Sequence, residues 1–412
     1  MLPRHVLLIA GLFAALLTSL VSAADAPLRD ALANLDASVV QGEEQKALAS
    51  MVGDLIRARR YQLSDQNTAE WEMVKNRADW QKFLAPKLEA LAASLGQFPA
   101  PAKDLNVRVT STVKGDGFRI ENLVFESRPG LWVTANLYRP EQETSSMPGI
   151  LICHAHHTPK AHGELQDMGM TWARAGCLVL VMDQLGHGER RQHPFNSDAD
   201  FSQKYRVSRQ DYHFRFDSGV QLHLLGDSLM GWMVYDLRRG VDLLLAQKGI
   251  DPKRIILLGS VAGGGDPAAV TAALEPRITC VASFNFGAPS PKPLYPYPLD
   301  KPPHWNFIGG GSWESTRNLT ASGRDGFLPW LLVAAAAPRH QVYAHEFGWF
   351  KEGDPTWQRL QAVYGFRDAG DRLSFTHGKG DVSKRPPEGT HCSHIGALHR
   401  VMMHDAFRNW FQ

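Results

Sequence analysis

The segment from Arg254 to Leu274 constrains the fold of this chain more than any other stretch. Its sequence, RIILLGSVAGGGDPAAVTAAL, begins with a short apolar run and ends with helix formers, and the small, glycine-rich stretch Gly259 to Gly265 separates the two. A buried strand must therefore turn sharply into a helix within a few residues. Such a turn needs small residues, because neighbouring backbone comes close and one residue takes a positive φ.

This strand, turn and helix have the shape of a nucleophile elbow, in which a serine stands at the apex of the turn. The pattern Gly-x-Ser-x-Gly begins at Gly259, but Val261 occupies the serine position. Counting back from the helix instead places Ala262 at the apex, and alanine tolerates a positive φ better than β-branched valine does. Ser260 carries the only hydroxyl of the turn. The segment therefore predicts an elbow without a serine at its apex.

The first 23 residues are typical of a secretory signal peptide. A basic start precedes an apolar run from Val6 to Leu17, and Val-Ser-Ala at 21–23 forms a small-residue cleavage site. The apolar run is too short for a stable membrane span. We therefore expect a secreted or periplasmic protein.

The charge of the chain limits its partners. A formal net charge of +2 over 412 residues, without a cluster of lysine and arginine, argues against nucleic acid or an anionic membrane. We expect a small-molecule or polysaccharide substrate instead, and the sequence does not indicate an oligomeric state. Cys153, Cys177 and Cys280 lie in or beside apolar strands, where cysteine packs as a small hydrophobic residue, so free thiols are favoured over a disulfide.

The hydrophobic pattern divides the mature chain into two parts. Residues 24–99 have apolar residues at helical spacing and predict an N-terminal helical extension. Residues 100–412 predict an α/β domain: residues 105–140 alternate with a period of two, as antiparallel edge strands do, and the remainder alternates apolar runs with helices. That alternation is typical of a mostly parallel sheet with helices on both faces. A Pro/Gly-rich, aromatic stretch over 285–324 predicts a cap-like insertion.

The parallel strands and the helices of this domain can be placed by residue number. The predicted strands are Gly149–Cys153, Cys177–Met182, Arg254–Leu258, Ile278–Phe284, Gln341–Ala344 and Leu373–Thr376. The predicted helices cover 164–175, 219–247, 267–275, 325–336, 355–366 and 394–411.

Histidines gather just after these strands, where ligands of open parallel sheets bind. Imidazole and carboxylate are the usual general acids and bases, so this clustering predicts a site at the carboxyl edge of the sheet. The acids Asp183 and Glu346 follow two of the strands. Eight of the 17 histidines of the chain follow the strands: His154, His156, His157, His187, His345, His377, His391 and His394.

Five elements, in their order along the chain, resemble the α/β-hydrolase fold. They are CHAHH at 153–157 after one strand, DQLGHGER at 183–190 after the next, the glycine-rich elbow, Pro338-Arg339 before a late strand, and a histidine-bearing loop before the C-terminal helix. Within this fold, residues 100–412 resemble the bacterial esterases related to acetyl xylan esterases and dienelactone hydrolase. The resemblance implies a carboxylic ester hydrolase that acts on acyl or methyl esters of a carbohydrate or small molecule.

The same resemblance implies a triad of serine, acid and histidine in that chain order. The acid falls on Glu346 or Asp354, and we favour Glu346 because Asp354 precedes a proline and looks like a helix N-cap. The histidine falls on His391 or His394, and we favour His394 because it stands directly before the last helix.

Two further roles follow from the resemblance. Backbone N–H groups of Gly263 and of the stretch Ala155 to His156 would form the oxyanion hole, which does not depend on side chains. Asp183 would brace the neighbouring loops, with Arg190 or Arg191 as the partner that a buried carboxylate needs.

Three interpretations of the missing serine remain open. Ser260 could supply the hydroxyl from a shifted elbow, with His394 as its base. Alternatively, Ala262 replaces the serine and leaves an inactive binding protein. In the third interpretation no serine is needed, because a transition metal such as zinc carries the nucleophilic hydroxide. Outside this third case we expect no cofactor; its candidate ligands are His154, His156, His391 and His394.

Overall fold

The computed structural model describes residues 27–35, 40–155, 159–192, 210–291, 305–308, 319–391 and 395–411. The chain divides into two compact units, residues 1–59 and 60–412. The boundary lies inside the predicted helical extension, within helix α2 (Gly42–Glu72). The predicted signal peptide lies outside the described residues. None of the helices among the described residues is long and apolar enough to cross a membrane.

Most described residues of the first unit are helical, with a helix over 27–33 followed by the first part of α2. The second unit contains the rest of α2, the helix α3 (Arg77–Ser94) and the whole sheet. Asn76 caps α3, since its side chain accepts hydrogen bonds from the N–H groups of Ala78 and Asp79.

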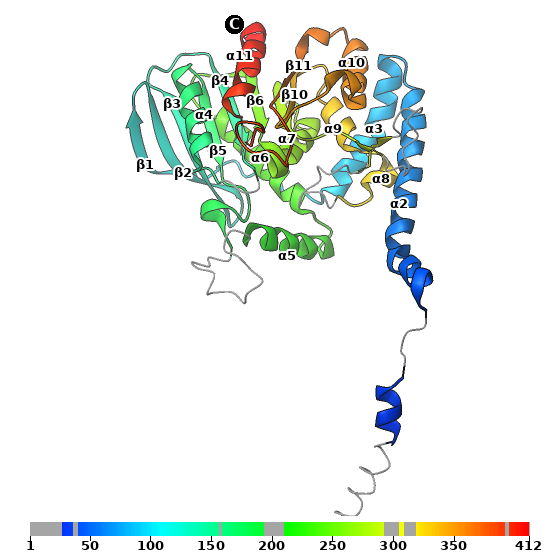
Figure 1. Cartoon of the computed structure of the whole chain (residues 1–412). Helices are drawn as coiled ribbons and strands as arrows, with labels where there is room; N and C mark the ends of the chain where they lie inside the picture. Colours follow the sequence, from blue (N-terminus) through cyan, green and yellow to red (C-terminus); the bar gives the residue numbers. More distant parts are fainter. Residues whose placement is uncertain are drawn as a thin grey trace, which may run out of the picture. The chain divides into compact units, whose positions relative to one another are not determined.

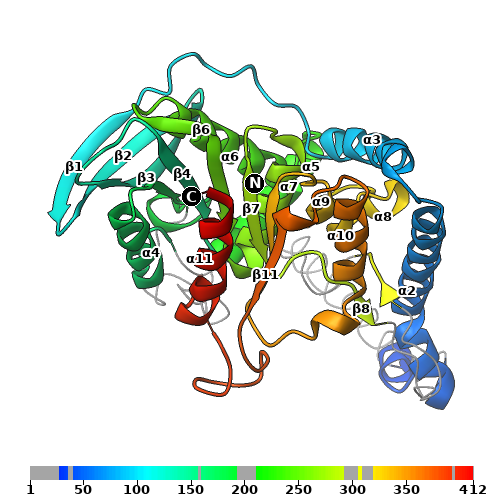
Figure 2. The same cartoon turned by 90° about the horizontal axis from the view of Figure 1, so that it is seen from above.

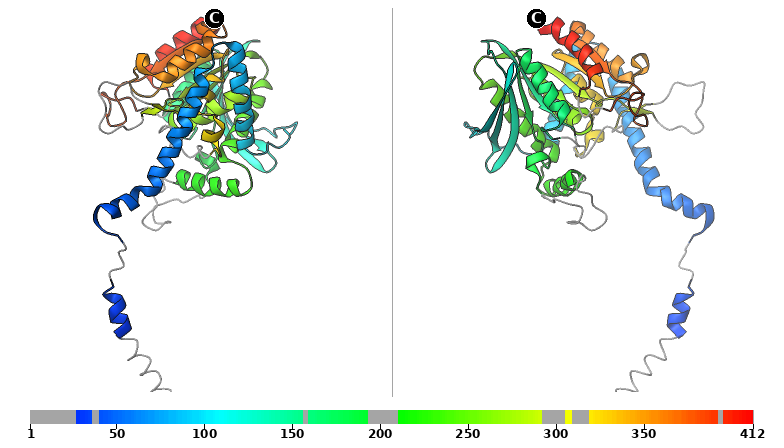
Figure 3. Two further views of the ribbon diagram at one scale, coloured as in Figure 1. Left: turned by 90° about the vertical axis from the view of Figure 1, so that its right-hand side faces the viewer. Right: turned by 60° about the vertical axis from the view of Figure 1, so that its left-hand side comes forward.

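The second unit is built on a nine-stranded sheet with the order β1-β2-β3-β5-β4-β6-β7-β10-β11 (Figure 1). The strands β1 to β3 are antiparallel and lie at one side of the unit, away from α10 and α11 (Figure 3). From β5 to β11 every neighbouring pair is parallel. The strands are β1 (Arg108–Gly115), β2 (Phe118–Arg128), β3 (Leu131–Pro140), β4 (Met147–Cys153), β5 (Leu178–Met182), β6 (Ile250–Gly259), β7 (Cys280–Phe284), β10 (His340–His345) and β11 (Leu373–His377).

Helices cover both faces of the sheet because alternate strand residues point to opposite sides. Ile150 and Ile152 pack with helices α4 (Gly163–Arg174) and α11 (Ala397–Phe411). Leu151, between them, packs on the other face with α6 (Leu229–Leu245) and α7 (Val261–Leu274). Figure 2 shows the two pairs of helices on opposite sides of the strands. The predicted α/β-hydrolase class, with a mostly parallel sheet and helices on both faces, is confirmed.

A third cluster joins the N-terminal helix α3 to the sheet domain. The side chains of Trp80 and Trp330 are fully buried there, together with apolar residues of α9 (Pro329–Ala334) and α10 (Pro355–Gly365). The remaining elements are α5 (Gln210–Leu224), α8 (Ser322–Asp325) and the two-stranded sheet of β8 (Ser290–Pro291) and β9 (Trp305–Asn306). The 285–324 insertion is thus described only in part, and its role as a cap stays a prediction.

Two of the predicted helices are wrong because each is broken by a glycine. The segment 219–247 forms α5 and α6 rather than one helix, since Gly226 has a φ of 79° and the Ser228 hydroxyl caps α6 by accepting from the N–H of Gly231 (2.9 Å). The segment 325–336 is divided into α8 and α9 at Gly326, which has a φ of 76°. Cys153, Cys177 and Cys280 are not in disulfide bonds, as predicted.

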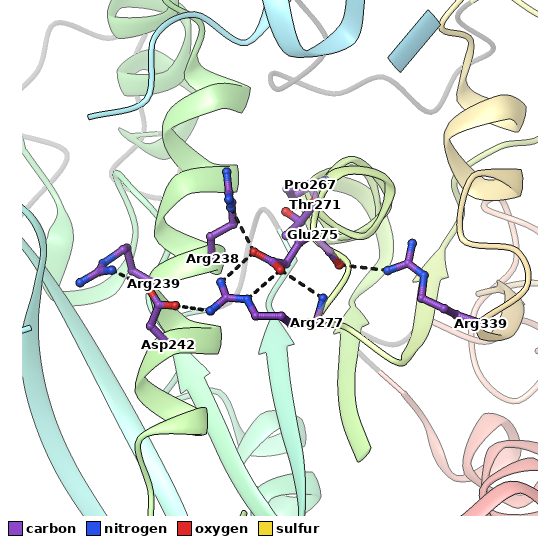
Figure 4. A network of polar contacts seen from close by, with 8 residues as sticks. All are labelled: Arg238, Arg239, Asp242, Pro267, Thr271, Glu275, Arg277 and Arg339. Carbon is purple, nitrogen blue, oxygen red and sulfur yellow. Dashed lines mark hydrogen bonds and ion pairs between the residues drawn. The ribbon is translucent and has the colours of Figure 1, made fainter. Parts of the chain in front are cut away.

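The carboxyl end of the elbow helix α7 is fixed by a network of charges (Figure 4). Glu275, whose side chain is buried, accepts hydrogen bonds from Arg238 (3.1 Å) and Arg277 (2.8 Å). Arg339 donates to the carbonyl oxygens of Glu275 (3.0 Å) and Ile278 (2.9 Å), and also to that of Ala272. A cation that satisfies the last carbonyls of a helix stabilises its C-terminus. The Pro338-Arg339 motif is therefore structural.

Glycines at the other end of α7 allow very close backbone contact. A Cβ atom on Gly265 would lie 2.0 Å from the carbonyl oxygen of Phe284 on β7. We predict that Gly265→Ala lowers the free energy of unfolding by about 3 kcal/mol, because backbone cannot yield as a side chain can. Chemical denaturation measures this. Gly365→Ala, in the last turn of α10 with no atom within 4 Å of the added Cβ, is the matched control and should be neutral or slightly stabilising.

Candidate functional site

The elbow begins where β6 ends. The N–H group of Ser260 donates to the carbonyl oxygen of Cys153 on β4 (2.9 Å), and this hydrogen bond extends the parallel ladder by one residue. The Ser260 side chain is fully buried, and α7 starts at Val261. Ser260 thus directly follows β6 and occupies the N-cap position of α7.

The left-handed residue described in the turn is Gly263, with a φ of 87°. It directly follows Ala262, the residue that we placed at the apex. Next in the chain, Gly264 presses on the end of β4: a Cβ atom there would lie 2.6 Å from the Cys153 carbonyl oxygen and 2.7 Å from that of His154. The turn therefore packs directly against the residues that lead to Ala155.

This contact brings together the two segments predicted to form an oxyanion hole. One is the turn at Gly263 and the other is the stretch that begins at Ala155, which is buried. His156, the second residue of that stretch, lies outside the described residues. Backbone donors at such a junction would be rigid, because the glycine contact fixes both segments.

His154 is held by backbone on both sides of its ring. Its Nε2 accepts from the N–H of Gln184 (2.9 Å), so the proton is on Nδ1, which donates to the carbonyl oxygen of Ala155 (2.7 Å). The side chain is fully buried. Because both ring nitrogens are used, the interpretation of His154 as a metal ligand is wrong.

Two other strand-end histidines also bind backbone carbonyls, and a third stacks on an indole ring. Nδ1 of His187 lies 3.1 Å from the Leu185 carbonyl oxygen, and Nδ1 of His377 lies 3.0 Å from that of Gly378. His345 stacks on Trp349 with ring centroids 4.6 Å apart, and burial, together with nearby His377, lowers its pKa to about 3. His345 is therefore uncharged near neutral pH. These histidines shape the loops at the sheet edge.

Asp183 is a buried brace, but its partner differs from the prediction. Its carboxylate accepts from Nζ of Lys160 (2.7 Å) and from the Thr134 hydroxyl (2.8 Å). Burial alone would raise the pKa of Asp183, yet the charge and hydrogen bonds of Lys160 outweigh it and lower the pKa. Arg190, one of the two expected partners, forms its ion pair with Asp236 (2.8 Å) and reaches only the carbonyl oxygen of Asp183. The prediction that an arginine pairs with this carboxylate is wrong, because Lys160 is its cationic partner.

Glu346, the favoured acid, lies one residue past β10 and is half-buried. Asn285, one residue past β7, holds it from the side. The Asn285 amide nitrogen donates to Oε2 of Glu346 (3.1 Å), and its amide oxygen accepts from the Glu346 N–H (2.8 Å). Asn285 has a φ of 55°, a conformation that asparagine tolerates better than most residues. Sequence reasoning missed this residue, although an asparagine directly after a buried strand is a usable signal.

Asp354 is the N-cap of α10, as its sequence context predicted. Its carboxylate accepts from the N–H of Thr356 (2.8 Å) and from the indole of Trp349 (2.8 Å). These contacts occupy the carboxylate with structural partners, so Glu346 is the better placed of the two candidate acids.

Of the two candidate histidines, only His391 is among the described residues. It is exposed, and its Nε2 lies 2.6 Å from the carbonyl oxygen of Lys384 in the same loop. His394 lies outside the described residues and stays a prediction. A residue that sequence reasoning missed, His399 in the first turn of α11, donates from Nε2 to the carbonyl oxygens of His345 and Glu346 (3.1 Å each). It therefore positions the backbone that carries the acid.

The described part of the chain offers little support for a metal centre. No three His, Cys, Asp or Glu side chains gather there in a way that could hold an ion. Since His154 is engaged by backbone, the proposed ligand set would rest on His391 and on two residues that are not described.

Comparisons with known proteins agree with this geometry. Residues 103–286 match the family model described as Acetyl xylan esterase (AXE1), a segment that includes β1 to β7 and the elbow. The chain has the α/β-hydrolase fold, and its residues 103–286 are similar to this family. The resemblance to acetyl xylan esterases that the motifs indicated is thereby confirmed. A search of curated protein sequences finds no match to this α/β-hydrolase.

Several solved structures share the fold. A proposed acetyl xylan esterase from Bacteroides fragilis NCTC 9343 is 17% identical with a TM-score of 0.55, and the match covers 81% of this chain and 83% of that one. A methylesterase is 18% identical with a TM-score of 0.56 over 85% and 68%. A glucuronoyl esterase from Solibacter usitatus is 16% identical with a TM-score of 0.52 over 82% and 95%. At such identities the similarity shows the fold alone.

The buried pair of Asp183 and Lys160 makes a testable contribution to stability. We predict that Asp183→Asn lowers the free energy of unfolding by about 3 kcal/mol at neutral pH, because Lys160 loses its main buried partner. The folded-state pKa of Asp183 is lowered, so the stabilisation is present above the unfolded pKa of about 4 and is lost as the pH falls below it. Denaturant titrations of both proteins from pH 3 to 7 measure the difference.

The matched control for this variant is Asp405→Asn on α11, whose carboxylate is exposed and pairs only at the surface with Arg408. Asp405→Asn should change the free energy of unfolding by no more than about 0.5 kcal/mol at every pH. A difference between the wild type and Asp183→Asn that does not shrink below pH 4 would contradict the assignment.

The metal interpretation has its own test. Because the ring nitrogens of His154 are occupied, we predict that the purified protein retains less than about a tenth of an equivalent of zinc. We also predict that a chelator does not change the melting temperature, because only a metal that binds the folded state would have raised that temperature. Elemental analysis and thermal unfolding measure both. One equivalent of metal that is lost in His156→Ala would restore the metal interpretation.

Proposed function

We propose that this α/β-hydrolase acts on carboxylic esters of carbohydrates, either acyl or methyl esters, at the carboxyl edge of the sheet. One observation carries the proposal: the elbow turn at Gly263 and Gly264 packs against the end of β4, where an ester carbonyl would meet backbone donors from both segments. The AXE1 match and the esterase names of the structural relatives support the substrate class.

The proposed chemistry differs from a serine mechanism because the elbow offers no accessible serine. Ala262 has no hydroxyl, and the Ser260 side chain is buried. We propose that water attacks the ester carbonyl directly and that the imidazole of His394, oriented by Glu346, takes its proton. The backbone donors stabilise the oxyanion, and the C–O bond to the alcohol then breaks as the alcohol takes that proton from the imidazolium. No acyl-enzyme forms, so turnover should be slow.

A second candidate is a conventional serine hydrolase with Ser260 as the nucleophile. The observation in its favour is that Ser260 carries the only hydroxyl of the turn. Its burial and its place in the strand ladder favour the first proposal instead.

The two candidate mechanisms predict different effects when a serine is introduced at residue 262 or removed from residue 260. We predict that Ala262→Ser raises kcat for p-nitrophenyl acetate by at least about 100-fold, because an apex serine would gain a base and oxyanion donors that are already in place. The matched variant Ser260→Ala should leave the slow wild-type rate within about twofold. Acetate release from acetylated xylo-oligosaccharides provides the same comparison with a carbohydrate ester.

Two outcomes would count against this account. Loss of activity in Ser260→Ala would favour the serine mechanism. A folded Ala262→Ser variant without any gain would show that residue 262 is not the apex. If the wild type binds acetylated oligosaccharides but releases no acetate, its role is ester binding without turnover.

A further inference from the structure

A cleft of about 470 Å³ lies apart from the elbow, between the C-terminal part of α2, strand β9 and helix α10. All of its lining residues belong to the unit 60–412 and to the described residues. This volume is in the range that small-molecule and saccharide sites occupy. Its lining residues include neither the elbow nor Glu346.

Aromatic side chains form much of the cleft. Trp71 and Trp305 are half-buried, so part of each indole stays accessible, whereas Phe307 is buried beneath. Trp71 packs edge-on against the buried Trp330, with ring centroids 5.0 Å apart, which fixes the orientation of its ring. Rigid, partly exposed aromatic faces suit the apolar C–H face of a sugar ring, which stacks on them at little entropic cost.

A buried arginine provides hydrogen-bond donors at the same place. Arg359 is only 7% exposed, and its guanidinium lies 3.6 Å from the ring centroid of Phe307. Nη2 donates to the Thr68 hydroxyl (3.4 Å), but Nη1 has no hydrogen-bond partner among the described residues. Burial, only partly offset by the charge of Glu72, lowers the pKa of Arg359 to about 9. Arg359 itself lines the cleft, so its guanidinium charge stands beside the aromatic side chains.

The acidic residues of the cleft decide which kind of ligand fits. Asp65 and Glu72 are exposed, line the cleft and lie seven residues apart, hence on one face of α2. Two carboxylates against one guanidinium disfavour an anionic ligand, but they accept hydrogen bonds from hydroxyl groups. We propose that this cleft binds a neutral saccharide, stacked on Trp71 and Trp305 and hydrogen-bonded to Asp65 and Glu72.

The cleft is well placed to hold part of an extended substrate. Helix α10 begins at Pro355, directly after the loop that starts with Glu346, and β9 pairs with β8, which begins six residues after β7 ends. Helix α10 and the β8–β9 pair, which form two walls of the cleft, thus follow strands whose carboxyl ends lie at the edge of the proposed ester site. A function in presenting an esterified chain rests on the proposed function, whereas saccharide binding itself does not.

The inference is tested by isothermal titration calorimetry on the full mature chain. The probes are xylohexaose, cellohexaose and mannohexaose, which carry neither charge nor ester, and an oligogalacturonide of the same length. At least one neutral probe should bind with a Kd between micromolar and millimolar. Trp305→Ala should weaken that binding about tenfold or more, and Glu72→Ala, an exposed position that keeps the core intact, at least about threefold.

The matched control is Trp132→Ala, which removes an indole that is 39% exposed on β3 at the other side of the sheet, and it should bind as the wild type does. Three results would overturn the inference: no neutral probe binds, only the oligogalacturonide binds, or binding survives in both Trp305→Ala and Glu72→Ala. Because p-nitrophenyl acetate is too small to reach the cleft and the elbow together, Trp305→Ala should hydrolyse it at the wild-type rate. Failure of the saccharide site is thereby distinguished from failure of the ester chemistry.

Discussion

Close backbone contact at the start of α7 is the constraint on which the rest of this structure depends. Gly264 lies against the carbonyl oxygens at the end of β4, and Gly265 lies against that of Phe284 at the end of β7. Three neighbouring strands, β4, β6 and β7, therefore meet at one turn that has no room for a side chain. This contact needs glycine, so the turn can form whether or not a serine stands at its apex.

Buried charges fix the elements around this turn. Glu275 and Arg339 hold the carboxyl end of α7, while Lys160 and Asp183 fix the loops that follow β4 and β5. Each buried carboxylate has a cationic partner and several hydrogen bonds, as burial of a charge requires. These contacts therefore hold the elements around the turn without any contribution from a serine at its apex.

The sequence predicted those features that follow from local patterns. The ends of the parallel strands were placed within two residues, except that β6 begins four residues before its predicted start, because short apolar runs alternate with helices. Asp354 was identified as a cap from its place before Pro355. The helix over 219–247 was wrong because a strong apolar pattern continues through Gly226, where a left-handed residue outweighs it. Periodicity alone cannot show such a break.

Contacts between distant segments were beyond sequence reasoning. Asn285, which follows β7, donates to the carboxylate of Glu346, which follows β10. From α11, His399 donates to the carbonyl oxygens of His345 and Glu346. Lys160, rather than an arginine, pairs with Asp183 because the chain folds back after β4. The clustering of histidines at the sheet edge was correctly located, but the described rings largely bind backbone carbonyls. The residue types predicted that histidines lie at this edge of the sheet, but their hydrogen-bond partners could be identified only from the structure.

The central claim is that the elbow of this α/β-hydrolase is formed but has no nucleophilic serine. Intact-mass spectrometry after treatment with a fluorophosphonate tests it most directly, because the reagent forms a stable adduct only with an activated hydroxyl. The account predicts no mass increase for the wild type and a single adduct on residue 262 in the Ala262→Ser variant. A stoichiometric adduct on Ser260 of the wild-type protein would contradict it.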